Sequence, residues 1–339
     1  MKHPDNYQDL IAPIDPAIIK AELSEQHLLR KTNRAGNELY TFRAQEAPNT
    51  MLELGRLREE AFRYYGGGTG KPADIDEFDL DPDGYYQLIV WDPEEHIILG
   101  GYRYMLGGDV KVKDGKTMLA SSEIFDYSDL FLKEYLPRSI ELGRSFVRVD
   151  YQQAGLRPKS IFALDNLWDG LGALILIHDQ YEYFFGKVTM YKDYNRQARD
   201  LIIYYMNTHF RSEVDLMHAL YPVPYETPVE ELAEVIKGED AKADYKALNK
   251  AVRDLGVNIP PLVNAYIGLS SSLMVFDVSL NAGFSNVEET GIMIPMLEIT
   301  EDKKRRHIES FLRDAAKKYR PNLIARIRKR LRPGTASDK

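Results

Sequence analysis

The sequence of 339 residues contains no cysteine. Disulfide bonds, cysteine nucleophiles and thiolate metal sites are therefore excluded, and the composition suits a reducing compartment. Long apolar runs are also missing. The longest lies near Leu171 to Ile177, far below the roughly 20 residues that a membrane-spanning helix needs. The start, Met1 to Tyr7, lacks the apolar core of a signal peptide. We therefore expect a cytoplasmic protein.

Two kinds of ligand site are disfavoured as well. The seven histidines are scattered, and none occurs in a ligand spacing such as H-E-x-x-H, so we predict no metal site. The glycine-rich segment Gly66–Lys71 does not fit a phosphate-binding loop. Tyr65 stands at the position of the motif's first glycine, and Pro72 stands where a hydroxyl should bind magnesium. We expect a mobile loop there.

Charge is unevenly distributed along the chain, whose net charge is −8. Residues 301–339 contain fourteen Lys or Arg and five Asp or Glu, a net charge of +9, and the preceding residues carry a net charge of −17. Such a division is typical of a basic tail on an acidic body.

Within residues 303–332 the apolar residues have helical spacing. We expect either a helix packed on the body or a peripheral contact with an anionic membrane. Nucleic acid is not expected, because aromatic residues for base stacking are nearly absent.

The order of apolar patterns predicts an α/β fold. Strands are expected at residues 39–42, 85–91, 96–106, 139–151, 183–190, 273–280 and 291–297, and helices at 18–29, 51–65, 126–136, 161–175 and 194–210. We divide the chain into an N-terminal extension (1–45), a main domain (46–300) with a helical insertion (221–258), and a basic helical tail (301–339).

The most informative stretch is Ser139–Tyr151, whose apolar residues fit a strand buried on at least one face. Glu141 and Arg144 stand three residues apart on this strand, around Gly143. In a regular strand these two side chains point to opposite faces, whereas a bulge at Gly143 brings them to one side. A buried strand has little reason to carry two charges unless they are paired or functional. The pair is therefore either a structural ion pair or part of a catalytic site.

Two neighbouring segments carry further charge. Residues 74–83 contain six carboxylates but lack the spacing and the terminal glutamate of a calcium loop, so a solvated acidic loop is the simplest interpretation. After the strand, a turn that contains Gly155 leads into a helix. Free backbone N–H groups at such a helix start favour a phosphate or pyrophosphate, and Arg148, Arg157 and Lys159 supply positive charge nearby.

Several of these motifs resemble those of acyl-carrier-protein-dependent N-acyltransferases of the GNAT superfamily, which include ornithine-lipid N-acyltransferases and are related to acyl-homoserine-lactone synthases. The segment Glu141–Ser145 resembles their E-x-G-R signature. Four other segments also resemble the family's motifs: the L-R-x-x-x-F helix at 57–62, the acidic segment 76–81, the strand 184–189, and the P-P-L-x-x-x-Y segment 260–266 followed by Phe284. The resemblance extends from about Leu52 to Leu297.

The resemblance implies a GNAT-like mixed central sheet flanked by helices, and amide formation by direct attack of an amine on a thioester. Because the amine arrives mostly protonated, a general base is needed. The catalytic candidates are Glu141, as this base, and Arg144. An amino-acid acceptor brings a carboxylate, which an arginine fork recognises best. The substrate-binding candidates by resemblance are Arg58, Phe62, Asp76 and Asp79.

The resemblance also implies that the co-substrate is an acyl thioester on the 4'-phosphopantetheine arm of acyl carrier protein, with no bound cofactor. The turn after Leu156 lacks the glycine pattern of a coenzyme A site, which suits this donor better than the alternative, acyl-CoA. The acyl-donor candidates are Arg148, Gly155, Arg157 and Lys159. The acyl-pocket candidates are Leu262, Tyr266 and Phe284, which core packing explains equally well.

The expected function is transfer of a 3-hydroxy fatty acyl group from acyl carrier protein to the amine of an amino acid, with glycine as the expected acceptor, in membrane aminolipid biosynthesis. Two alternatives remain open at this point. One is an acetyl-CoA-dependent N-acetyltransferase of small molecules, and the other is a non-catalytic acyl-binding protein at the membrane surface.

Overall fold

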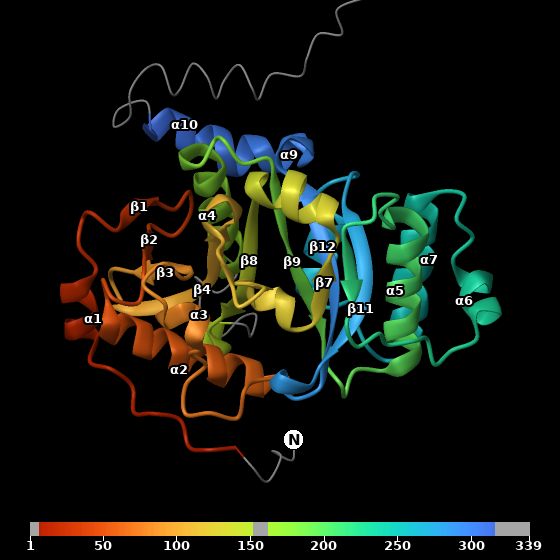
Figure 1. Ribbon diagram of the computed structural model, residues 1–339, viewed down its shortest axis with the longest axis horizontal. Coiled ribbons are helices and arrows are strands. Elements are labelled where there is room, and N and C mark those ends of the chain that lie inside the picture. Colours follow the sequence, from red (N-terminus) through yellow and green to blue (C-terminus); the bar gives the residue numbers. More distant parts are fainter. Residues whose placement is uncertain (1–6, 152–161, 316–339) are drawn as a thin grey trace, which may run out of the picture.

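The computed structural model describes residues 7–151 and 162–315. Its centre is an eight-stranded sheet in the order β1-β2-β3-β4-β8-β9-β12-β11 (Figure 1). The pair β8–β9 is parallel and the other neighbouring pairs are antiparallel, so the sheet is mixed, as predicted. Its strands are β1 (Leu28–Lys31), β2 (Glu38–Phe42), β3 (Tyr86–Asp92), β4 (Ile97–Leu106), β8 (Ser139–Val147), β9 (Tyr183–Met190), β11 (Met274–Asn281) and β12 (Val287–Pro295). Two small ribbons pair β5 (Val112–Lys113) with β6 (Lys116–Thr117), and β7 (Phe125–Tyr127) with β10 (Met217–Ala219).

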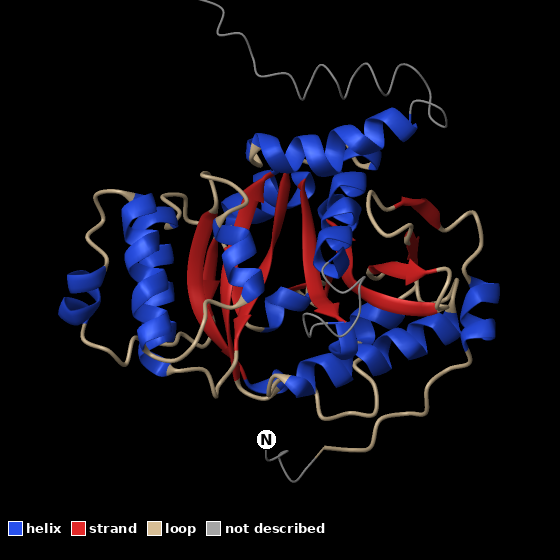
Figure 2. Cartoon of the chain, turned by 180° about the vertical axis from the view of Figure 1, so that it is seen from behind, coloured by secondary structure: helices blue, strands red, loops and turns tan. Residues whose placement is uncertain are grey.

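Helices cover both faces of this sheet (Figures 1 and 2). They are α1 (Pro16–Glu22), α2 (Pro48–Tyr64), α3 (Glu77–Leu80), α4 (Ala163–Ile177), α5 (Arg196–Phe210), α6 (Val229–Val235), α7 (Ala241–Asp254), α8 (Pro261–Ile267), α9 (Glu301–Lys303) and α10 (Ser310–Ala315). The helices α6 and α7 lie in the segment 221–258 that was expected to be a helical insertion.

The alternation of side chains along the strands identifies the two faces of the sheet. On β3, Leu88 and Val90 belong to the hydrophobic core that also contains residues of α4 and α5. The intervening residues Ile89 and Trp91 belong to a second core, which contains Leu54 of α2. One face of the sheet is therefore covered by α4 and α5, and the opposite face by α2.

The parallel strands β8 and β9 separate partway along their length. Their pairing extends from Ser139, opposite Tyr183, to Leu142, opposite Gly186. Both strands continue for several residues beyond this point, β8 to Val147 and β9 to Met190. The backbone groups that face each other across the resulting gap do not pair in these described strands. We call this gap the splay; the helices that follow its two strands are α4 and α5.

The beginning of the chain is part of the sheet. Strands β1 and β2 both lie within residues 1–45, and β2 pairs with β3, so this segment does not form a separate extension. The helix expected at 18–29 is shorter: α1 ends at Glu22, and Leu28–Lys31 pairs with β2 as a strand instead. In the same way, the helix expected at 126–136 is divided, because Phe125–Tyr127 forms β7 and the helical turns run through Phe131–Tyr135.

The segment after β12 packs against α4. It contains α9, a π-helical stretch at Lys304–Glu309, and α10 (Figure 1). Ile308 and Phe311 are buried in the core, and the His307 Nδ1 lies 2.7 Å from an oxygen of Asp169 on α4. The first part of the predicted basic tail is thus a helix packed on the body, and residues 316–339 lie outside the described residues. Within the ranges 7–151 and 162–315, no helix has the length and apolarity needed to cross a bilayer.

Candidate active site

The charged residues of β8 are brought to one face of the sheet by a bulge. Gly143 lies opposite Arg103 and Phe146 lies opposite Gly101, so β8 has one more residue than β4 between these pairs. Arg144, inside this interval, has a φ of 53°. The bulge therefore follows Gly143 rather than lying on it, but it has the predicted consequence. Arg144 and Glu141 both contact residues on the face that α2 covers.

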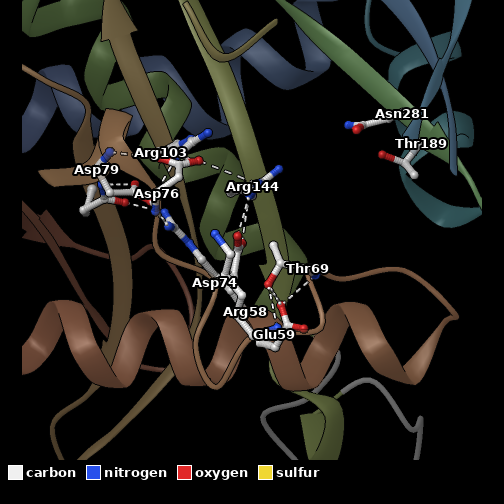
Figure 3. A network of polar contacts seen from close by, with 12 residues as sticks. Arg58, Glu59, Thr69, Asp74, Asp76, Asp79, Arg103, Arg144, Thr189 and Asn281 are labelled. Atoms are coloured by element: carbon white, nitrogen blue, oxygen red, sulfur yellow. Dashed lines mark hydrogen bonds and ion pairs between the residues drawn. The ribbon is translucent and has the colours of Figure 1, made fainter. Parts of the chain in front are cut away.

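A network of arginines and aspartates lies beside this bulge (Figure 3). Arg103 of β4 donates to both oxygens of Asp76, at 2.7 and 2.8 Å, and lies 3.0 Å from Asp79. Arg58 of α2, which is fully buried, donates to Asp79 at 3.2 Å and to Gln87. Asp76 and Asp79 also form a capping box on α3, which fixes their backbone. Asp74, Asp76 and Asp79 are therefore counterions of the arginines, and the interpretation as a solvated loop is wrong for these three carboxylates, whereas Glu77 and Asp83 are exposed.

Arg144 occupies the part of the network nearest the splay. Its Nε lies 2.8 Å from Asp74, and its Nη2 lies 3.7 Å from Asp76. Its guanidinium also stacks on Phe284, 4.6 Å from the ring centroid, and Phe284 packs edge-on against Phe62 at 5.1 Å. With 15% of its side chain exposed, Arg144 is held in place yet reachable from solvent.

The two buried aspartates respond differently to this environment. Burial raises the pKa of the Asp74 carboxyl, in spite of the nearby charges of Arg144 and Arg58. For Asp79 the effect of burial is outweighed by the charges of Arg103 and Arg58, and its pKa lies below the ordinary value. Asp79 is therefore a permanent anion that holds two arginines, because it is ionised throughout the neutral range.

Glu141 is buried in a nest of hydroxyl groups. One carboxylate oxygen accepts from the Tyr85 hydroxyl, and the other accepts from the hydroxyl and the backbone N–H of Ser121. Tyr127 in turn donates to the Ser121 hydroxyl, at 2.5 Å. Burial raises the pKa of the Glu141 carboxyl despite these hydrogen bonds. Three donors occupy three of about four acceptor positions on a carboxylate, which leaves one position for a proton.

A second charged cluster lies across the splay, on β9 and β12. Lys187 directly follows Gly186, the last residue of β9 that pairs with β8. Its Nζ lies 2.6 Å from Glu289, which also accepts hydrogen bonds from Asn281 at 2.7 Å and Thr189 at 3.1 Å. Figure 3 shows Asn281 and Thr189 on the far side from the Arg144 group. The splay is thus bordered by Arg144 on one strand and Lys187 on the other.

The structure brings five of the predicted residues together: Arg144, Arg58, Phe62, Asp76 and Asp79. Glu141 is connected to them indirectly, because the ring of its partner Tyr85 lies 4.7 Å from the Arg103 guanidinium. It does not unite the three acyl-pocket candidates. Phe284 packs with Phe62 on the α2 face, whereas Tyr266 lies on the opposite face against Trp168 of α4. Leu262, on the same helix as Tyr266, is half-buried.

The predicted donor-binding residues are only partly visible. Arg148 pairs with Asp150 at 2.8 Å, so its charge is neutralised locally. Gly155, Arg157 and Lys159 lie outside the described residues. The phosphate turn that was expected to contain them is therefore not part of the described site.

Sequence reasoning missed several residues of the site. Arg103 was overlooked although it interrupts the apolar strand 96–106, which is the same signal that singled out Glu141. Lys187 was noticed only as part of a motif, and its partner Glu289 lies about a hundred residues further along the chain. Ser121 carries no local signal, because its role depends on a contact with Glu141.

Comparison with known proteins identifies the family. The family model described as an acetyltransferase (GNAT) domain matches residues 57–157, which include Arg58, the aspartates, Arg103 and β8. No solved structure gives a significant match. Two relatives are similar over most of their length. One, from Phocaeicola vulgatus, is 53% identical over 90% of this chain and 94% of the relative. The other, from Bacteroides thetaiotaomicron, is 51% identical over 90% of this chain and 91% of the relative.

Both relatives are named glycine N(alpha)-acyltransferase. At this identity and coverage, the fold and the N-acyl transfer chemistry of these relatives are shared. The chain belongs to the GNAT superfamily, in the same N-acyltransferase family as these two proteins.

Proposed function

We propose that this N-acyltransferase transfers a 3-hydroxy fatty acyl group from acyl carrier protein to the amine of glycine, and that the product serves membrane aminolipid biosynthesis. The observation that carries the proposal is the position of Arg144. It is a partly exposed arginine held by Asp74 at the mouth of the splay. The names of the two relatives support glycine as the acceptor.

Arg144 is the proposed binding group for the acceptor carboxylate. Among the described residues, its hydrogen bonds use Nε and its weaker contact uses Nη2. The Nη1 edge is left for a ligand, and a guanidinium edge binds a carboxylate strongly and with defined direction. Phe284 stacks on this guanidinium and fixes its plane. A bound glycine then lies at the splay with its amine directed along the gap.

Glu141 is the proposed proton acceptor. The ammonium of glycine must lose a proton before its nitrogen can attack a carbonyl carbon. The raised pKa of the Glu141 carboxyl makes it a stronger base than an exposed glutamate. Its burial means that the proton travels through a water or hydroxyl group rather than by direct contact.

The splay itself is the proposed site of the thioester. Unpaired backbone N–H groups on a diverging strand can donate to the thioester carbonyl and stabilise the negative charge that develops on its oxygen. The amine nitrogen attacks the carbonyl carbon, the C–N bond forms and the C–S bond breaks. The thiol of the phosphopantetheine arm leaves with a proton. No covalent acyl-enzyme is needed, in agreement with the absence of cysteine.

The test is a reaction of the purified protein with glycine and a 3-hydroxyacyl carrier protein, analysed by mass spectrometry for N-acylglycine. We expect amide formation with glycine and much less with alanine, serine or ornithine. The same reaction with acyl-CoA and with acetyl-CoA compares the donors. Turnover with acetyl-CoA alone would replace the proposal by small-molecule acetylation, and no turnover with any thioester would remove it. Lipid extracts of cells that overproduce the protein test the role in aminolipid synthesis.

A further inference from the structure

Helix α7 presents a row of exposed cations on an acidic protein. We call this row the basic stripe; it consists of Lys242, Lys246, Lys250 and Arg253, all exposed. Leu248 and Val252, on the other side of the helix, are fully buried. The stripe repeats every three or four residues and extends over about 16 Å at 1.5 Å per residue. It is thus one continuous helix face.

A surface hollow accompanies the second half of the stripe. Its volume is about 380 Å³, and it is lined by Tyr245, Lys246, Asn249, Lys250, Arg253 and Asp254. Asp254 pairs with Lys250 at 3.1 Å, and the cations outnumber it three to one. Every lining side chain ends in a polar or charged group, and three of the six are cationic, so the hollow suits an anionic partner.

The fold places this half of α7 at the same end of the molecule as the mouth of the splay. The helices α5 and α7 run antiparallel, because His209 near the end of α5 contacts Asp244 near the start of α7, at 2.8 Å. At their other ends, the Tyr194 hydroxyl before α5 donates to the Asn258 carbonyl after α7, at 2.9 Å. Since α5 follows β9, the end of α7 lies beside the segment that leads from the open end of β9 into α5. Figure 1 shows α7 next to α5.

Helix α8 connects the hollow with the helix on the other side of the splay. The Tyr245 hydroxyl, in the hollow, donates to Asn264 of α8. On the same helix, Tyr266 packs edge-on against Trp168 of α4, with 6.2 Å between the ring centroids. Side-chain contacts therefore connect the basic stripe through α8 to α4.

We infer that the basic stripe of α7 is the docking surface for the acyl carrier protein, whose acidic surface it binds. The inference rests on the proposed function, which names this donor. Residues 1–300 carry a net charge of −17, so an acidic partner is repelled by most of the surface and attracted where cations gather. A row of cations along one helix matches an elongated anionic surface, whereas a small free anion is bound best by converging groups. A membrane contact would need large apolar residues beside the cations, and this face offers only Tyr245 and the small side chain of Ala243.

The test compares two double variants that change the net charge equally. Lys246→Glu/Lys250→Glu reverses the charge of two lysines of the basic stripe. Lys113→Glu/Lys116→Glu reverses the charge of two exposed lysines on the β5–β6 ribbon. This ribbon follows the end of β4, which pairs with the start of β8 and therefore lies at the end of the β8–β9 pair opposite the splay. Initial rates are measured with 3-hydroxyacyl carrier protein and, separately, with the small donor 3-hydroxyacyl-CoA, at low and at physiological ionic strength. Thermal unfolding confirms that both variants fold.

We expect the stripe variant to raise the KM for the carrier protein by about tenfold or more at low salt, with kcat changed by less than about twofold. Its kinetics with acyl-CoA should equal those of the wild type, and the ribbon variant should match the wild type with both donors.

Equal KM values for the carrier in both variants would overturn the inference while leaving the donor assignment intact. A wild-type enzyme that uses acyl-CoA but not the carrier would instead overturn the proposed donor, and the inference with it. Unchanged carrier kinetics together with weaker flotation on anionic phospholipid vesicles would show that the stripe binds a membrane.

Discussion

At the scale of single residues, the site consists of charges that hold one another in place. Arg58 and Arg103 have 0% and 2% of their side chains exposed, and both bind Asp79, which is equally buried. Such groups keep fixed positions because leaving either partner alone in the interior costs about 3–5 kcal/mol. Arg144, which is 15% exposed, is the arginine of this group that a substrate can reach. In the proposed site, the buried arginines therefore support Arg144, and Arg144 contacts the substrate.

Replacement of Arg144 by lysine tests this division. Lysine keeps the charge but loses the planar fork and the stacking on Phe284, so we expect the KM for glycine to rise by about tenfold or more. The KM for the acyl donor should change little. The control is Arg148→Lys, four residues along, whose arginine pairs with Asp150. If both variants affect glycine equally, Arg144 does not bind the acceptor carboxylate.

The pH dependence of the reaction tests Glu141. Its folded-state pKa is raised by burial above the ordinary value of 4.5. Because the ionised form is the base, kcat/KM should fall as the pH decreases through this raised pKa. In Glu141→Gln we expect kcat to drop about 10²- to 10⁴-fold and this acid limb to disappear. Denaturant unfolding supplies the check on structure: a variant that is unfolded, or one that retains the acid limb, would mean that Glu141 supports the fold instead.

The sequence revealed the charges of the site but not their partners. Glu141 and Arg144 were found because charges are unusual on a buried strand. Asp74, Asp76 and Asp79 were misjudged because the arginines that neutralise them come from α2, β4 and β8, which are far away in sequence. The position of a counterion is a tertiary property that local spacing does not contain.

At the scale of elements, periodicity predicted the long and buried ones well. The strand at 183–190 has the expected bounds, and the helix expected at 51–65 is α2, Pro48–Tyr64. The strand β1 was missed because four residues give too short a pattern, and it exists through its pairing with β2. The residue at which β8 begins to diverge from β9 is set by the packing of the two backbones.

Gly186 is where this packing is tightest. A Cβ atom added at Gly186 would lie 2.4 Å from the Leu142 carbonyl oxygen, at the last pair before the splay. We expect Gly186→Ala to push the strands apart, to lower the free energy of unfolding by about 1–3 kcal/mol and to reduce kcat, because the backbone N–H groups beside the thioester move. At Gly268 the nearest atom would be 3.5 Å away, an ordinary contact, so Gly268→Ala is the matched control in urea denaturation. Equal stability of the two variants would show that the strands tolerate the extra carbon.

At the scale of the whole molecule, the turn between β1 and β2 and the segment after β12 are joined at one residue of α4. Asp169 accepts a hydrogen bond from His307 Nδ1 at 2.7 Å, and from the backbone and side-chain nitrogens of Asn33 at 2.8 and 2.6 Å. The sequence left open whether the segment after Lys303 packs on the body or contacts a membrane. For its first part, the buried contact with Asp169 decides in favour of packing.

Asp169→Asn tests whether this junction holds the C-terminal segment. The change removes the charge that faces His307 and replaces an acceptor by an amide, so we expect the free energy of unfolding to fall by about 1–3 kcal/mol. Trypsin should then cleave faster at Lys303–Arg306. Because α4 covers the face of the sheet opposite the α2 network, kcat and the KM for glycine should stay at wild-type values.

The control is Asp302→Asn, which removes the same charge at a site where 88% of the side chain is exposed. If both variants are cleaved at the same rate, Asp169 does not anchor the segment. If the Asp169 variant loses both its resistance to trypsin and its activity, the segment shapes the active site as well.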